Sequence, residues 1–313
     1  MLPVLLTCWK RPEKVLRVIE ALKVISPKKI YVSCDGPNKN IVGNYEKVEE
    51  TKKVLMENIN WDCKLSTKFF SENHGCRMAM TKAINWFFNN EIEGIIIEDD
   101  CLPSEEFFIF CSELINRYRF NNDIWSISGT NFQNGKWRGE GSYYFSKYFQ
   151  CWGWATWRDR WQNMDSDLEG WRKNKEKFFN NTFFESRKEK NYWSKIFNNL
   201  LYKNKPDSWA YRWAFTCFKN QGLTIIPNKN LVQNIGFDKE ATNTIFNLHD
   251  QKIKKGLIPL VHPNSILRDE IADNYTFKNH FDNFSLASKI KKALFNPFYY
   301  PKRIINLIIK GIQ

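Results

Sequence analysis

The sequence lacks the signatures of several common protein classes. It contains no G-x-x-x-x-G-K-[ST] loop and no G-x-G-x-x-G segment, so a P-loop ATPase or a Rossmann dehydrogenase would be without its fingerprint. A G-x-S-x-G hydrolase elbow is also missing. The eight cysteines are scattered without a C-x-x-C pair, which favours free thiols in a reducing cytoplasm over disulfides or zinc. The histidines show no zinc spacing either, and each is expected to be structural, with help in holding a metal as the alternative for His249 and His262: His74, His249, His262 and His280.

Long apolar runs are absent as well. No stretch approaches the roughly 20 residues of a membrane-spanning helix, and no signal peptide is visible at the start of the sequence. We therefore expect a cytoplasmic protein, with peripheral association at the inner face of the membrane as an option. That option comes from residues 285–313, where basic residues interleave with an apolar stripe. Such a helix can lie on an anionic membrane surface or dock on the protein's own core.

What the chain does contain indicates a folded protein with anionic partners. Its 313 residues include 16% aromatics, enough for one large or two modest domains with a real core. The formal net charge is +13, which favours nucleotide phosphates, an acidic membrane face or nucleic acid as partners.

Strand and helix patterns alternate through the first 122 residues. Short strand-like runs at 3–7, 29–34, 63–70 and 94–97 are separated by amphipathic segments of helical period. This order predicts an α/β fold with a doubly wound, mostly parallel sheet. The pattern of residues changes after residue 122. We therefore expect two halves of one domain, 1–122 and 123–262, followed by a C-terminal tail, 263–313.

Three acids stand where the fourth of these strands ends: Glu98, Asp99 and Asp100. Adjacent carboxylates beside an apolar strand need a cation or a set of donors, and ligands bind at strand carboxyl ends in open α/β sheets. Oxygen ligands at this point suit Mg²⁺ or Mn²⁺. The alternative is an acidic turn that caps the following helix.

Three more side chains are candidates near the same sheet edge. Asp35 follows the second strand and could accept from a base or ribose, or simply stabilise the Asp-Gly-Pro turn. Arg11 follows the first strand and could meet a phosphate or a base, or be an exposed helix-start charge. Arg77 opens a helix after a single-glycine turn, where a cation and free backbone N–H groups could meet pyrophosphate.

The block from 143 to 161 is crowded with aromatic residues, which are more often core than binding surface. Within it, Trp152 and Trp154 flank a glycine and would share one face of an extended chain. Flat aromatic faces stack on sugars and bases, so an acceptor groove is the functional alternative.

Taken together, these segments resemble glycosyltransferases of the GT-A fold, in particular the N-acetylglucosaminyltransferase I type and its bacterial relatives. The resemblance covers about residues 3 to 265. It rests on Arg11, the Ser33-Cys-Asp-Gly36 turn, Glu98-Asp-Asp100 as a form of the D-x-D motif, Trp125-Ser-Ile-Ser-Gly-Thr-Asn131, Gly153-Trp-Ala-Thr-Trp-Arg-Asp-Arg-Trp161, Trp209-Ala-Tyr-Arg-Trp213 and Asn234-Ile-Gly236.

The resemblance implies a metal-dependent, inverting transferase that builds surface glycans. Asp100 would ligate Mn²⁺ or Mg²⁺ on the donor diphosphate, with Glu98 and Asp99 on the ribose and sugar, and Arg11 and Asp35 on the base. The donor would be a nucleotide-diphosphate sugar, most simply a UDP-sugar carrying a hexose or N-acetylhexosamine. The acceptor would be a saccharide or lipid-linked glycan, which Trp152, Trp154 and Trp209 would contact.

One departure from the family pattern concerns the catalytic base. Related proteins often carry an acid directly after the first Trp of the W-x-x-x-W segment, where this chain has Ala210. Either Asp207 supplies the base instead, or the chain is catalytically impaired; we favour the second.

Two other protein classes stay open. One is a nucleic-acid-binding protein with a basic, aromatic surface, although no nucleic-acid motif appears, and the other is a nucleotidyltransferase, although no glycine-rich phosphate loop appears.

Overall fold

The computed structural model describes residues 1–180, 183–184, 186–236 and 252–282, which fall into two compact units with the division after Asp269. The first unit is built on an eight-stranded sheet in the order β3-β2-β1-β4-β8-β6-β9-β7. Each antiparallel pairing of this sheet lies beyond β4. The expected α/β class with a mostly parallel sheet is therefore confirmed.

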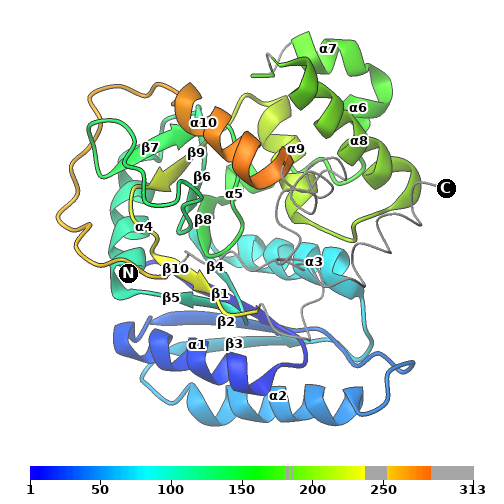
Figure 1. Ribbon diagram of the computed structural model, residues 1–313. Helices are drawn as coiled ribbons and strands as arrows, with labels where there is room; N and C mark the ends of the chain where they lie inside the picture. The colour runs from blue at the N-terminus through cyan, green and yellow to red at the C-terminus, as the bar shows by residue number, and fades with distance from the viewer. Residues whose placement is uncertain (181–182, 185, 237–251, 283–313) are drawn as a thin grey trace, which may run out of the picture. The chain divides into compact units, whose positions relative to one another are not determined.

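The parallel half follows the alternation of the first 122 residues. Its strands are β1 (Val4–Cys8), β2 (Lys29–Cys34), β3 (Lys64–Phe69) and β4 (Glu93–Glu98), and its helices are α1 (Pro12–Ile25), α2 (Asn44–Asn58) and α3 (Gly75–Asn90). Helix α1 has Pro12 in its first turn and buries a stripe at helical spacing: Val15, Val18, Ile19 and Leu22. Figure 1 shows α1 and α2 on one face of the strands and α3 on the other. All four strands therefore end at one sheet edge.

The strand β4 is followed by a short strand, β5 (Cys101–Pro103), which pairs with β10 (Val232–Asn234). Helix α4 (Glu105–Tyr118) begins only after β5, and the hydroxyl of Ser104 caps it by accepting from the N–H of Phe107. The acids at the end of β4 are thus separated from α4 by a strand. The alternative that they cap this helix is wrong.

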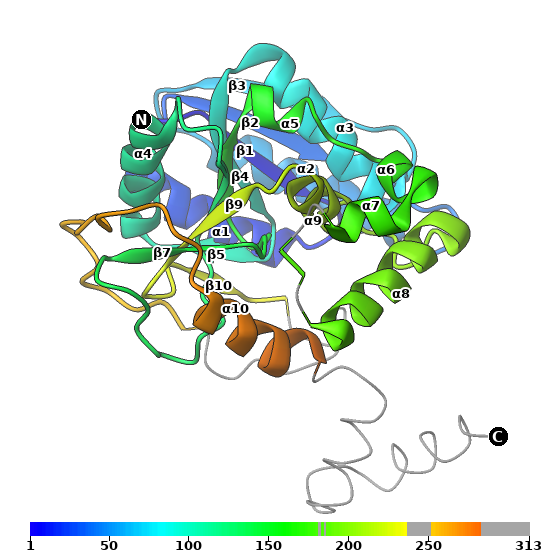
Figure 2. The same cartoon turned by 90° about the horizontal axis from the view of Figure 1, so that it is seen from above.

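Beyond β4 the sheet becomes mixed and its surroundings become aromatic. It contains β6 (Ile124–Ser128), β7 (Tyr143–Ser146), β8 (Trp154–Trp157) and β9 (Leu223–Pro227). Helices α5 (Arg158–Trp161), α6 (Glu169–Lys173), α7 (Lys175–Asn180), α8 (Arg187–Lys203) and α9 (Ala210–Lys219) complete this half. In Figure 2, α6, α7 and α8 gather on the opposite side of the sheet from α4.

The second unit is described only over α10 (Glu270–Thr276) and the π-helical turn η1 (Phe277–Phe281). The basic segment 285–313, expected to form an amphipathic helix, lies outside the described residues. Among the residues that are described, none of the helices is long and apolar enough to cross a membrane.

Candidate functional site

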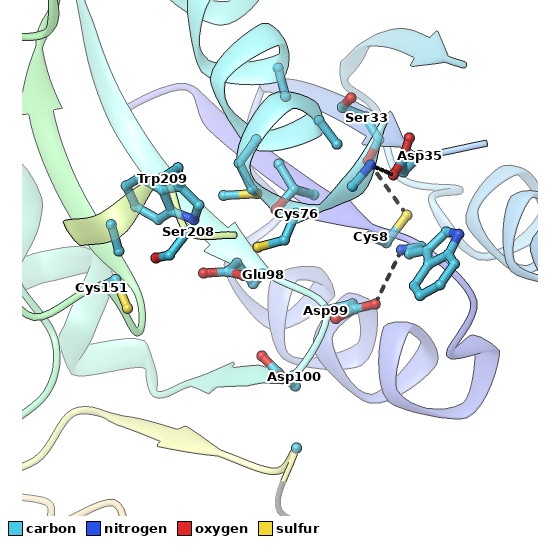
Figure 3. A pocket seen from close by; sticks show the side chains of 18 of the residues that line it. Cys8, Ser33, Asp35, Cys76, Glu98, Asp99, Asp100, Cys151, Ser208 and Trp209 are labelled. Atoms are coloured by element: carbon cyan, nitrogen blue, oxygen red, sulfur yellow. Dashed lines mark hydrogen bonds between the residues drawn. The ribbon is translucent and has the colours of Figure 1, made fainter. Parts of the chain in front are cut away.

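A cavity of about 390 Å³ lies where β1, β2 and β4 end. The residues that line it come from segments far apart in the sequence: 7–11, 33–35, 73–83, 98–100, 151–152, 207–210 and 234–236. Ligand sites of open α/β sheets form at this edge, and small-molecule pockets occupy roughly 300–1,000 Å³. Figure 3 shows the cavity with its lining side chains. Of the predicted site residues, all but Arg77 and Trp154 line it.

The carboxylates that follow the buried strand β4 enter this cavity along different directions. Figure 3 shows Glu98, Asp99 and Asp100 spreading out from the strand end rather than meeting at one point. Asp99 is almost fully buried, and Asp100 keeps 16% of its side chain exposed. The sequence thus places three acids at one edge, but each has its own surroundings.

Arg11 pairs with two of these acids. Its guanidinium donates from Nη1 to Asp100 Oδ2 at 2.9 Å, from Nε to Asp99 Oδ2 at 3.3 Å, and from Nη2 to Asp99 Oδ1. The N–H of Trp9 also donates to Asp99 at 3.3 Å. With 15% of its side chain exposed, Arg11 is not the exposed helix-start charge that the sequence left open. Its contacts in the structure are carboxylates, and its contact with a donor base stays a prediction.

Glu98 is left outside this ion pair. Burial raises the pKa of Glu98 to about 8. The negative charges of Asp100 and Asp99 add to this shift, and the positive charge of Arg11 opposes it. Burial also raises the pKa of Asp99, although Arg11 opposes the change. Three carboxyl groups therefore share one guanidinium, and the site favours a further cation or protons.

The same end of β4 offers oxygen atoms to a hard cation. A Cβ at Gly236 would lie 2.3 Å from Asp100 Oδ2 and 3.0 Å from Asn234 Oδ1, so both oxygens lie close against this glycine, and Asn234 Oδ1 accepts its N–H at 2.7 Å. In the described part of the chain, no three His, Cys, Asp or Glu side chains form a closed metal cage. Mg²⁺ commonly takes one or two carboxylates and completes its shell with water and phosphate. The residues present fit such a cation.

Asp35 holds the loop that precedes α3. Its carboxylate accepts the N–H groups of Gly36 and His74 at 2.9 Å and of Gly75 at 3.2 Å, and the side-chain amide of Asn73 at 2.9 Å. These bonds tie the end of β2 to the first turn of α3. Asp35 therefore stabilises not only its own Asp-Gly-Pro turn, as one alternative had it, but also the loop before α3. Asp35 also lines the cavity, so its contact with the donor stays a prediction.

Arg77 forms an ion pair with Asp207 and is not left free for a ligand phosphate. Its Nε lies 3.3 Å from Asp207 Oδ1, and its backbone N–H donates to Oδ2 at 3.4 Å. Gly75 adopts φ +76°, and a Cβ there would stand 2.8 Å from the same Oδ2. The carboxylate thus takes the favourable position for an anion at the start of α3. The expectation of a cation and N–H groups free for pyrophosphate is corrected on this point.

The two tryptophans expected to share an acceptor face have separate environments. Trp152 lines the cavity and packs edge-on against Phe132, with ring centroids 5.4 Å apart. Trp154 is fully buried and stacks on Trp209, also at 5.4 Å. The acceptor role of Trp154 is therefore wrong, because a fully buried indole has no surface for a ligand. Gly153 causes the divergence: its φ of +64° interrupts the extended chain before β8 begins.

Trp209 and Ala210 place the start of α9 against the cavity. Trp209 is 2% exposed, and its ring belongs mostly to the aromatic core. Ala210 is the first residue of α9 and lines the cavity together with Asp207. A carboxylate introduced at 210 would therefore enter the cavity that holds the acids of β4.

Several lining residues were missed from sequence: Trp9, Cys76, Cys151, Ser208 and Asn234. Trp9 and Asn234 lie within or beside segments that carry the family resemblance, which was the available signal. No feature of the sequence indicated that Cys76 and Cys151 would line the cavity. Burial raises the pKa of Cys76 and of Cys151, with Glu98 and Asp100 adding to the shift, so both stay neutral.

The sequence matches no protein-family model and no characterised protein. Among solved structures, similarity extends to HddC from Yersinia pseudotuberculosis, with 12% identity, 51% of this chain and 78% of that chain covered, and a TM-score of 0.31. A putative glucose-1-phosphate thymidylyltransferase from Bacillus anthracis shares 7% identity over 52% of this chain and 74% of its own, with a TM-score of 0.33. The 4-diphosphocytidyl-2C-methyl-D-erythritolsynthase from Anaerococcus prevotii shares 8% over 62% and 84%, with a TM-score of 0.31. Likenesses this partial carry no functional argument, and none of the three is described as a glycosyltransferase.

Proposed function

We propose that this chain is a metal-dependent, inverting glycosyltransferase that moves a sugar from a nucleotide-diphosphate donor to a saccharide or lipid-linked acceptor. The observation that carries the proposal is the convergence of Arg11, residues 98–100, residues 207–210 and residues 234–236 on one cavity. The family resemblance rests on these segments, and Arg11 and Gly236 are 225 positions apart in the chain, so folding brings them together.

The donor end of the site is assigned to the edge formed by β1, β2 and β4. Asp100, with the neighbouring amide oxygen of Asn234, would hold a divalent cation. When bound, that cation stabilises the negative charge that develops on a departing diphosphate. Asp99 positions Arg11, and Glu98 lies beside them for the sugar or ribose hydroxyls. The nucleotide is assigned as uridine on the resemblance alone.

The acceptor end is assigned to the walls contributed by the second half. Trp152 offers a partly exposed ring, and Trp209 holds the start of α9 against the cavity. An acceptor hydroxyl must lose its proton as it attacks, and a positioned carboxylate is the usual recipient. Asp207 is the carboxylate on this wall, held by Arg77, while Ala210 offers only a methyl group. Residues 1–122 would thus supply most of the donor end and 123–262 the acceptor end, with Asn234 as a contribution of the second half to the donor end.

The nucleotidyltransferase alternative needs a different segment after β1. Enzymes of that kind place a glycine-rich loop against the phosphates. Here β1 runs through Trp9 and Arg11 directly into Pro12 of α1, and Arg11 is fixed by its two carboxylates. This segment has no glycine that would let backbone N–H groups wrap a triphosphate.

The proposal is tested by metal-dependent nucleotide binding. UDP and a panel of nucleotide sugars are compared in thermal-shift assays with and without Mn²⁺, using the parent, Asp100→Asn and the control Asp62→Asn. Asp62 is 95% exposed and paired only with Lys28 among the described residues. We expect Mn²⁺-dependent stabilisation in the parent and the control and its loss in Asp100→Asn.

Equal nucleotide binding by Asp100→Asn in the presence of Mn²⁺ would contradict the assignment. A second incubation, with nucleoside triphosphates and sugar 1-phosphates, separates the alternative. Pyrophosphate release in that reaction, without sugar transfer from a nucleotide sugar, would replace the proposal by a nucleotidyltransferase.

A further inference from the structure

The guanidinium of Arg11 contacts the carboxylate that the proposed function assigns to the divalent cation. Its Nη1 donates to Asp100 Oδ2, the oxygen that also lies against Gly236. Among the described residues, the other oxygen of Asp100 accepts a weak contact from the thiol of Cys101 at 3.5 Å and no stronger one. Arg11 is thus the strong partner of Asp100 in the described structure.

Asp99 holds Arg11 independently of Asp100. Two guanidinium nitrogens, Nε and Nη2, pair with the two oxygens of Asp99, in the forked geometry that makes arginine–carboxylate pairs strong. A single nitrogen, Nη1, pairs with Asp100. Asp99 is also the more buried of the two acids, so the contact with Asp100 is the one that breaks more easily.

We propose that Arg11 is an internal counter-ion that competes with the divalent cation for Asp100, so that Nη1 must leave Asp100 when the cation binds while Asp99 retains the guanidinium. This inference rests on the metal dependence of the proposed function. Two cations on one carboxylate oxygen repel each other, and the arginine charge cannot be removed by deprotonation. When the cation takes Oδ2, the oxygen that lies with Asn234 Oδ1 beside Gly236, this repulsion displaces Nη1.

Once displaced from Asp100, Nη1 is available to bind the nucleotide. Held by Asp99 at the cavity wall, Arg11 would turn Nη1 toward the cavity, where a nucleotide diphosphate offers it a new anionic partner. Nucleotide then makes it easier for the cation to bind, and by linkage the cation makes it easier for the nucleotide. Without nucleotide, Arg11 would keep the affinity for free metal low.

The test measures Mn²⁺ affinity without nucleotide, from the electron paramagnetic resonance signal of free Mn²⁺ at fixed ionic strength. Arg11→Met removes the charge and keeps the length of the side chain. We expect Arg11→Met to bind Mn²⁺ about tenfold more tightly than the parent, in the range of couplings found between interacting sites. We also expect UDP to increase the Mn²⁺ affinity of the parent by a larger factor than that of Arg11→Met.

Two further variants keep the test decisive. Lys10→Met removes the same charge at the neighbouring position, where the ammonium lies 4.6 Å above the ring of Trp9. It should match the parent, and an equal gain in Lys10→Met would overturn the proposal. Arg11→Lys keeps the charge but cannot bridge two carboxylates, so we expect its Mn²⁺ affinity to lie between those of the parent and Arg11→Met. This variant carries the test if Arg11→Met fails to fold.

The outcomes separate this inference from the proposed function. If Asp100→Asn loses Mn²⁺-dependent UDP binding while Arg11→Met and Arg11→Lys bind Mn²⁺ no more tightly than the parent, the transferase site stands and the counter-ion role falls. If neither the parent nor an Arg11 variant binds Mn²⁺ through Asp100, with or without UDP, both fall.

Discussion

The two halves of the sheet use their side chains in opposite ways. At the carboxyl ends of β1 and β4, three buried or partly buried carboxyl groups lie around a single guanidinium. Beyond β4, four tryptophans pack on one another at centroid distances from 5.0 to 6.4 Å, and each is at most 2% exposed: Trp154, Trp161, Trp209 and Trp213. The first arrangement costs stability and can bind a ligand, whereas the second supplies stability.

The two regions meet at the start of α9. Trp209 stacks on Trp154 within the aromatic core, and its neighbours Asp207 and Ala210 line the cavity. The aromatic core thus fixes the wall that faces the carboxylates. Rigid packing behind a polar site is what holds catalytic groups in place.

The largest expected effect is on the aromatic side. Trp154→Ala should lower the free energy of unfolding by about 3–5 kcal/mol, the usual range for a buried tryptophan. Trp154→Phe should lower it much less, since Nε1 of Trp154 is buried without a hydrogen-bond partner in the described structure. Urea unfolding followed by circular dichroism measures both. The matched variant is Trp152→Ala, at the partly exposed position of the same segment.

Trp152→Ala should lower the unfolding free energy much less than Trp154→Ala, because the ring of Trp152 is only partly buried against Phe132 and the core, and it should weaken acceptor binding. If Trp152→Ala destabilised the protein as strongly as Trp154→Ala, the division of this segment into a core residue and a cavity residue would be wrong.

The next effect concerns the wall where the two regions meet. If the chain lacks its base, Ala210→Asp should raise the rate of sugar transfer by about 10²–10⁴-fold with little change in donor affinity. Asp207→Asn in the parent should then change little. Initial rates with a nucleotide sugar and an acceptor panel, together with donor affinities, measure this.

The reverse pattern has an equally clear meaning. If Asp207→Asn removes an activity that the parent has, and Ala210→Asp adds none, Asp207 is the base and its ion pair with Arg77 positions it. Arg77→Met, as a further variant, would then reduce the rate without removing a carboxylate.

How far the sequence predicts the structure differs between the regions for physical reasons. The helices and strands of the parallel half follow hydrophobic periodicity, and β2 was predicted with its observed bounds, Lys29–Cys34. The acids after β4 could be placed at the site because parallel strands end at one edge. Local pattern was sufficient for both.

Contacts between distant segments were beyond such reasoning. Arg77 and Asp207 are 130 positions apart, and nothing near either one indicates the other. The divergence of Trp152 and Trp154 depends on the positive φ of one glycine, which a simple alternation pattern does not reveal. Asn234 reaches Asp100 through the pairing of β10 with β5, two strands of three residues each that carry little signal of their own.

The smallest expected effect is the pH dependence of the charged side. In the folded protein the pKa of Glu98 is about 8, whereas its ordinary value is 4.5. The native state therefore holds this proton more tightly than the unfolded chain does. The contribution of Glu98 to stability is fully present below about pH 4.5 and declines as the pH rises toward 8. Over this range the unfolded chain releases the proton, whereas the folded protein keeps it because an ionised Glu98 would add a negative charge beside Asp99 and Asp100.

Glu98→Gln removes this titration and keeps the shape of the side chain. In buffer with a chelator, its unfolding free energy relative to the parent should increase from pH 5 to pH 9 by roughly 1–3 kcal/mol. Urea unfolding at pH 5, 7 and 9 measures the difference, with Glu57→Gln on the exposed side of α2 as the control. A difference that does not change with pH would mean that Glu98 is ionised in the folded protein throughout this range. The carboxylates at the end of β4 would then be better compensated than their contacts indicate, and the contrast between a strained charged edge and a satisfied aromatic core would lose its main support.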